Sequence, residues 1–160
     1  LILIIKLFNI HDYDIFLKYN LSIMFFNMVP IIPLDGAIIL KSILNKIFSF
    51  KTSYKLYVVI SIINIIIYVG FNYKYSLNNY LIIGIFIYKI INSIKEYKYI
   101  YNRFLLERYL KKYKFKYLNT KVGTLDILKL DTYQYFKEDK KIVSEEKKLA
   151  ERFDKSRYFW

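Results

Sequence analysis

The sequence contains no cysteine, a single histidine and only two prolines among its 160 residues. The absence of cysteine excludes disulfide bonds and thiolate metal sites. One histidine, His11, excludes a metal site built from several histidines of this chain alone. Acidic residues are also scarce, with 13 Asp and Glu against 26 Lys and Arg. Together with a hydrophobic content of 56 %, this basic balance is typical of a membrane protein with positively charged cytoplasmic segments.

Long apolar runs are what the sequence has in abundance. Three of them approach the roughly 20 residues that a helix needs to cross the hydrocarbon layer: Tyr19–Leu40, Leu56–Tyr73 and Leu77–Ile94. The third contains Lys89, whose side chain can reach the membrane interface from near a helix end. Leu1–Ile10 is shorter, and we expect it to be the tail of a further helix. The alternative, buried strands of a soluble β core, is disfavoured because strands rarely exceed about ten residues.

Lysines between the apolar runs predict the orientation of the chain. Lys41–Lys55 carries four lysines and no acid, and Lys95–Lys121 carries nine Lys or Arg against two Glu. The positive-inside rule places both segments in the cytoplasm, so the second and third runs form a helical hairpin with its tip outside. Nucleic-acid binding is disfavoured, because anionic headgroups account for a basic segment beside a membrane helix. We predict a multi-pass protein of the cell membrane, in contact with membrane lipid, whose C-terminal tail is cytoplasmic.

The tail has a different character from the apolar runs. Asn102–Tyr113 has helical spacing, and it either lies on the membrane surface or continues the preceding helix. Lys114–Tyr135 alternates around Gly123 in a way that predicts a small hairpin. Glu138–Lys155 is expected to be a solvated helix, with a start signal at Ser144. Its acidic and basic side chains would share one exposed face: Glu145, Glu146, Glu151, Lys147 and Lys148.

These patterns predict the fold class and the domain organisation. We expect an all-α polytopic membrane core over residues 1–94, made of a broken helix followed by a helical hairpin. Residues 95–160 form a small mixed α+β cytoplasmic tail.

One acidic residue, Asp35, is the only charged residue in the run of 22 residues around it. A carboxylate at membrane depth costs roughly 2.5–3.5 kcal/mol, so its presence indicates a functional site. The residues around it suggest a helix that is broken to aim backbone and side chain at a ligand: Asn27, Pro30, Pro33 and Gly36. A simpler interpretation is that Asp35 caps a helix that starts at Gly36.

His11, among polar neighbours, is expected to be an exposed loop residue and not a metal ligand.

The pattern Asn27-x-x-Pro30-x-x-x-Leu34-Asp35-Gly36 resembles the second signature of the site-2 protease family of intramembrane zinc metalloproteases. Within that family it is most similar to the small bacterial form related to the stage IV sporulation metalloprotease. The resemblance implies that Asp35 is a zinc ligand and that Asn27 and Pro30 bind substrate. It also implies a structural role in shaping the broken helix for three residues: Pro33, Leu34 and Gly36.

The chain departs from the family pattern in two ways. The first signature, His-Glu-x-x-His, which supplies two zinc ligands and the general base, does not occur, and Ala37 replaces a second glycine. The resemblance therefore assigns no catalytic residue to this chain. It implies the C-terminal portion of a zinc endopeptidase that cleaves membrane-associated peptide or protein substrates near the cytoplasmic face. We expect a missing N-terminal half to supply the general-base Glu and the other ligands, and favour this over an inactive relative.

The rival hypothesis is non-enzymatic. It describes a membrane scaffold or accessory subunit in which Pro30, Pro33 and Asp35 form a helix break that binds a partner.

Overall fold

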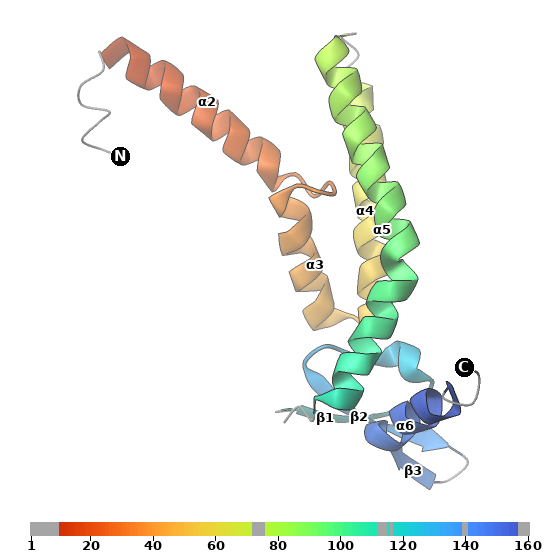
Figure 1. Cartoon of the computed structure of the whole chain (residues 1–160). Helices are drawn as coiled ribbons and strands as arrows, with labels where there is room; N and C mark the ends of the chain where they lie inside the picture. The colour runs from red at the N-terminus through yellow and green to blue at the C-terminus, as the bar shows by residue number, and fades with distance from the viewer. Residues whose placement is uncertain (1–9, 72–75, 112–114, 116, 139–140, 157–160) are drawn as a thin grey trace.

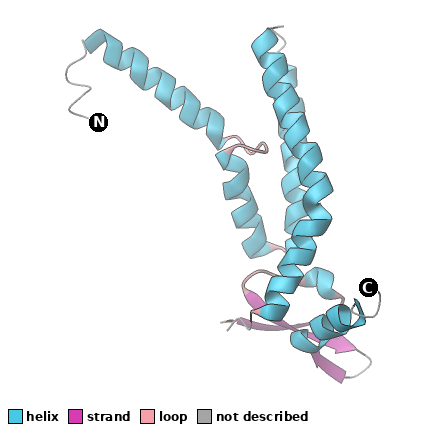
Figure 2. Cartoon of the chain, in the orientation of Figure 1, coloured by secondary structure: helices cyan, strands magenta, loops and turns pink. Residues whose placement is uncertain are grey.

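The computed structural model describes residues 10–71, 76–111, 115, 117–138 and 141–156. Within these ranges lie five α-helices, one short 3-10 helix and three strands. Figure 1 shows helix α2 (Ile10–Met28) diverging from a pair of long helices, α4 (Phe50–Phe71) and α5 (Leu77–Leu110). Helix α3 (Asp35–Ile47) runs beside α4, and the strands lie at the foot of the helices (Figure 2). Residues 1–9, which include most of the expected upstream helix tail, lie outside the described residues.

Helices α4 and α5 form the predicted helical hairpin. Among the described residues, these two helices are long and apolar enough to cross a membrane. Their lengths of 22 and 34 residues correspond to about 33 and 51 Å. The Tyr54 hydroxyl donates to the carbonyl of Ser93 at 2.9 Å and so links the two helices. The interpretation of these runs as β-strands is wrong, because the described residues of both runs fold as α-helices.

Helix α5 continues past residue 94 to Leu110, so the stretch that starts at Asn102 extends this helix. At about 51 Å, α5 is longer than the roughly 30 Å hydrocarbon layer, and its C-terminal part is free to carry the tail. Leu105, fully buried, packs there with Leu125, Leu128 and Phe136 of the tail. Part of this core therefore comes from the same helix that belongs to the hairpin.

The tail contains a three-stranded sheet in the order β1-β2-β3, with β1 (Tyr117–Lys121), β2 (Thr132–Glu138) and β3 (Lys141–Ser144). Strand β1 pairs with β2 in parallel, and β3 pairs with β2 antiparallel. The predicted hairpin around Gly123 is therefore wrong, because parallel strands need a crossover connection. That connection, residues 122–131, includes the 3-10 helix η1 (Leu125–Ile127).

Helix α6 (Glu145–Ser156) begins directly after the predicted start signal, and the Ser144 hydroxyl accepts the backbone N–H of Lys147 at 3.4 Å. The predicted helix was too long at its N-terminal side, because Lys141–Ser144 pairs with β2 as a strand. The assignment of Glu145 to a solvated face is also wrong. Only 2 % of this residue is exposed, whereas the charge pattern alone predicted an exposed side chain.

Glu145 is buried because Arg108 of α5 binds it. Arg108 donates from Nε to Oε1 at 2.5 Å and from Nη2 to Oε2 at 2.9 Å. The remaining donors of the guanidinium reach backbone carbonyls of the tail at 2.5, 3.3 and 2.8 Å, those of Lys129, Leu130 and Thr132. Since a buried charge is stable only when it is paired and hydrogen-bonded, this network explains how both charges remain inside.

The pair predicts a large difference between two arginine substitutions. Arg108→Met removes all of these donors and leaves a buried carboxylate unpaired, so we expect a loss of about 3–5 kcal/mol in the unfolding free energy of the tail. Arg103→Met breaks an exposed pair with Glu107, at 64 % and 43 % side-chain exposure, and should cost at most about 1 kcal/mol. Urea unfolding followed by tyrosine fluorescence measures both. Equal losses would contradict the role of Arg108.

Candidate functional site

Six residues, Val29–Leu34, form the loop between α2 and α3. Two tight turns shape it: the N–H of Ile31 donates to the carbonyl of Val29 at 2.8 Å, and the N–H of Leu34 donates to that of Ile31 at 2.6 Å. Neither Pro30 nor Pro33 has an N–H to continue a helix, and the Ile32–Pro33 peptide bond is cis. The predicted break of the motif helix is therefore confirmed.

Two isoleucines anchor this loop against the helices. Ile31 and Ile32, 1 % and 6 % exposed, belong to the core formed with Tyr57 and Val58 of α4. Burial of such a side chain stabilises the fold by about 1.5–3 kcal/mol. In Figure 1 the loop projects from the α2–α3 junction toward the α4–α5 hairpin, consistent with this contact. The sequence interpretation missed both anchors, although two apolar residues between prolines were their visible signal.

Gly36 is required by a close approach of two backbone segments. A Cβ atom at this position would lie 2.0 Å from the carbonyl oxygen of Met28 and 2.8 Å from the carbonyl carbon of Val29. No side chain fits there, because real contacts of this kind stay above about 3 Å. The end of α2 and the start of α3 are thereby packed directly on each other. The role of Gly36 in shaping the family motif stays a prediction.

Asp35 is the first residue of α3, with Leu34 in the N-cap position and no side-chain cap bond. The simpler interpretation of Asp35 as the N-cap is therefore wrong. Its side chain is exposed, and within the described part of the chain no hydrogen bond or ion pair involves its carboxylate. A negative charge in the first turn is favourable to the helix dipole by a few tenths of a kcal/mol to about 1 kcal/mol.

Lys41, the next charged residue after Asp35, does not pair with it. The Lys41 ammonium lies over the rings of Tyr54 and Tyr57, 5.0 and 5.4 Å from their centroids. The surface beside the carboxylate is instead apolar, with Ile38 and Ile39 about half exposed. The Asp35 carboxylate, which has no partner among the described residues, thus lies on an exposed apolar surface of the protein.

The structure brings the predicted site residues together around the α2–α3 junction. Asn27 and Asp35 each lie one residue from the backbone contact of Gly36 with Met28. Asn27 is half-buried at the end of α2, and Pro30 is half-buried in the loop. Pro33 is exposed and Leu34 half-buried. The roles in substrate binding and metal ligation that the resemblance assigns to these residues stay predictions.

The described residues contain no group of three or more His, Cys, Asp or Glu side chains that could hold a metal ion. Asp35 alone supplies one of the four positions that zinc fills in proteins, so a zinc site here needs ligands from other residues. His11 lies in α2, so its prediction as a loop residue is wrong.

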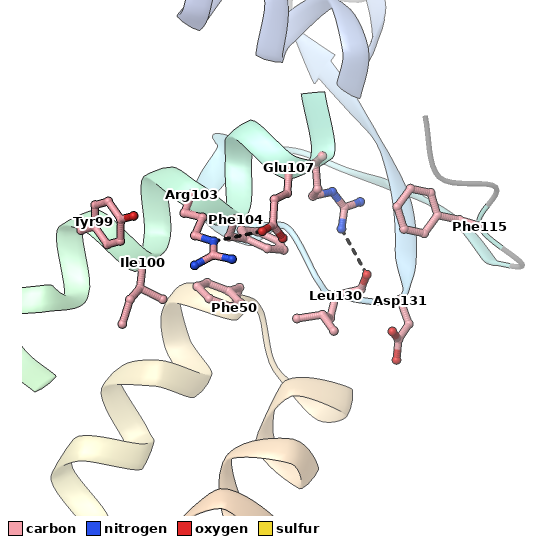
Figure 3. Close-up of a pocket in the computed structure, with 10 residues that line it drawn as sticks. Phe50, Tyr99, Ile100, Arg103, Phe104, Glu107, Phe115, Leu130 and Asp131 are labelled. Carbon is pink, nitrogen blue, oxygen red and sulfur yellow. Dashed lines mark hydrogen bonds and ion pairs between the residues drawn. The ribbon is translucent and has the colours of Figure 1, made fainter. Parts of the chain in front are cut away.

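A cavity of about 650 Å³ lies elsewhere, at the foot of α4 and α5. Figure 3 shows Phe50 beside Phe104, with Arg103 and Glu107 bonded to each other over them. The Phe50 and Phe104 rings stack at a centroid distance of 4.1 Å. No residue of the Asn27–Gly36 motif lines this cavity, so it does not belong to the motif site.

Comparison with known proteins gives one similarity of direct interest. Over 117 residues, the chain is 32 % identical to Stage IV sporulation protein FB of Bacillus subtilis (strain 168). The matched region covers 62 % of this chain and 35 % of that protein, so the chain spans about a third of the length of its curated relative. No protein-family model matches the chain.

The Gly36 contact generates a prediction with an internal control. Gly36→Ala must push the α2 and α3 backbones apart, so we expect a loss of about 1–3 kcal/mol or more in stability. Gly84→Ala in α5 has nothing within 4 Å of the added methyl group, and alanine should stabilise that helix by up to about 1 kcal/mol. Thermal unfolding in detergent compares the two. A neutral Gly36→Ala would show that the contact is not needed.

Proposed function

We propose that this chain is the C-terminal portion of a site-2-type intramembrane zinc metalloprotease. Three observations support the proposal: the motif Asn27–Gly36, the packing that requires Gly36, and the partial similarity to Stage IV sporulation protein FB. The name of that relative agrees with the subfamily that the motif resembles. The substrate would be a membrane-associated peptide or protein.

The observation that carries the proposal is the state of Asp35. Its carboxylate is exposed on an apolar surface and has no partner in the described chain. An unpaired carboxylate at membrane depth is costly, so a ligand or cation that compensates the charge is expected. Around it the backbone is held by buried Ile31 and by the Gly36 contact, which makes the position of the carboxylate well defined.

The chemistry of a carboxylate oxygen fits one ligand position of a zinc site. In such hydrolases the metal supplies the activation of water for attack on a peptide carbonyl. In this proposal Asp35 holds the metal from the start of α3, and the two other protein ligands and the general base come from residues outside this chain. Asn27, half-buried beside the same junction, has an amide that can donate to and accept from a substrate backbone.

The non-catalytic alternative rests on the missing ligands. The sequence has one histidine, and the described residues contain no group of three ligand-type side chains, so these residues alone do not supply a complete set of zinc ligands. A scaffold or accessory subunit would use the same helix break to bind a partner. Zinc-dependent cleavage by the reassembled protein separates the two hypotheses.

Contacts at the foot of the hairpin indicate that the two basic segments, the α3–α4 turn and the tail, lie on the same side of the membrane. Lys129 of the tail donates to the carbonyl of Ile47 at 2.6 Å, so the tail meets the α3–α4 turn. Both segments are rich in lysine, and the positive-inside rule favours the cytoplasm for each. We propose a multi-pass protein of the cell membrane whose tail and α3–α4 turn face the cytoplasm.

Asp35→Asn tests the ligand assignment in the complete protein, that is, this chain together with the polypeptide that carries His-Glu-x-x-His. Loss of one anionic ligand should lower zinc-dependent cleavage by more than the roughly 10–100-fold that follows loss of an outer-shell partner. Zinc content, measured by mass spectrometry of the purified protein, should fall in parallel. Asp154→Asn, an exposed acid of α6, is the matched control and should change neither quantity. Full activity of Asp35→Asn would refute the proposal.

The orientation is tested by single thiols, because the chain has no cysteine. Asn78→Cys lies at the start of α5 and Lys111→Cys directly after its end, and both positions are exposed. We expect a membrane-impermeant maleimide to label Asn78→Cys in intact cells and Lys111→Cys only after permeabilisation. The reverse pattern would show that the tail lies outside.

A further inference from the structure

The connection between β1 and β2, residues 122–131, contacts helices α3 and α4 at three places. Lys129 Nζ donates to the carbonyl of Ile47, the last residue of α3, at 2.6 Å. The N–H of Phe50, the first residue of α4, donates to the carbonyl of Leu128 at 2.9 Å. Lys51 Nζ binds Oδ2 of Asp126 at 2.5 Å. All three contacts fall within residues 47–51, where α3 ends, the chain turns and α4 begins.

The connection is itself firmly held by the tail. Leu125 and Leu128, 8 % and 1 % exposed, are part of the core formed with Phe136 and Leu149. Arg108 binds the carbonyls of Lys129 and Leu130 from the other side. The connection is therefore a fixed surface, and the α3–α4 turn is held against it.

Asp126 receives a second donor, the Tyr101 hydroxyl, at 2.8 Å. The hydrogen bond from Lys51, followed by that from Tyr101, holds the pKa of the Asp126 carboxyl below its usual range. The carboxylate thus remains charged at neutral pH and joins α4, α5 and the connection in one network.

Helix α3 connects this contact at Ile47 to Asp35 of the motif. It has 13 residues and is about 20 Å long, with Ile47 at one end and Asp35 at the other. Between them, the side chain of Asn45 accepts a hydrogen bond from buried Ser53 of α4, and Ala37 and Leu44 are buried against the hairpin. A short helix held at its last residue and along one face moves as a rigid unit.

We propose that the β1–β2 connection positions the Asp35 carboxylate through α3, with Lys129 and Asp126 as positioning residues. Lys129 binds a carbonyl at the C-terminal end of the helix, where a cation also interacts favourably with the helix dipole. The inference deepens the proposed function, because it assigns to the tail the task of holding the ligand residue in place.

The test measures the position of the first turn of α3 without using activity. Nitroxide labels at Ile38→Cys in α3 and Ile85→Cys in α5, residues that are 58 % and 54 % exposed, report one distance distribution by pulsed electron resonance. We expect this distribution to shift and broaden in Asp126→Ala/Lys129→Met. The conservative Asp126→Glu/Lys129→Arg should restore it, since both donor and acceptor return. An unchanged distribution would overturn the proposal.

Two controls make the result specific. Labels at Ile62→Cys and Ile85→Cys report the α4–α5 hairpin, which should keep its distance; equal broadening of this pair would mean general unfolding and would overturn the proposal. Lys137→Met/Asp154→Ala removes one base and one acid at exposed positions of β2 and α6, and should leave both distances unchanged.

The activity of the complete protein then adds an independent readout. Asp126→Ala/Lys129→Met should lower kcat with little change in KM, because the ligand residue is displaced while substrate binding persists. The distance measurement requires neither zinc nor cleavage. It therefore still tests the role of the β1–β2 connection if the protease hypothesis fails. An altered distance with unchanged kcat would overturn the role in catalysis.

Discussion

The ion pair between Arg108 and Glu145 is the constraint on which the tail depends. Both groups are buried, and two charges in such a place are stable only if nearly every donor and acceptor is used. Arg108 meets this condition by binding one carboxylate and three backbone carbonyls, while Glu145 also accepts the backbone N–H of Gln134. This one network joins α5, α6, β2 and the β1–β2 connection. A lysine could not replace the arginine, since its ammonium lacks the planar fork that reaches several acceptors at once.

The network has consequences beyond the tail, because the connection that it holds also binds the α3–α4 turn. The path runs from Arg108 to the carbonyl of Lys129, from the Lys129 ammonium to Ile47, and along α3 to Asp35. At the far end, the Gly36 backbone packs on Met28 and fixes the start of the same helix. Helix α3, which carries the candidate ligand Asp35, is thus held at both ends. The polar network holds its C-terminal end, and backbone packing holds its N-terminal end.

Local signals predicted the elements well where one physical effect dominates. The uncharged runs predicted α4 and α5, because long apolar segments favour helices over strands. Pro30 and Pro33 predicted the break between α2 and α3, because neither can continue a helix. Ser144 predicted the start of α6. The prediction failed at Gly123, since the parallel pairing of β1 with β2 joins strands that a local alternation pattern cannot distinguish from a hairpin.

The sequence by itself determined the helical hairpin, the broken motif and the isolation of Asp35 among apolar residues, because each follows from neighbours along the chain. Only the tertiary structure decided that Glu145 is buried, that Gly36 is needed for a backbone contact, and that Lys129 reaches Ile47. Each fact depends on a contact between residues that are separated along the chain, by 37 positions for Glu145 and Arg108, 8 for Gly36 and Met28, and 82 for Lys129 and Ile47. Burial and pairing of a charge depend on what the fold brings beside it, and charge spacing within one helix contains no information about that neighbour.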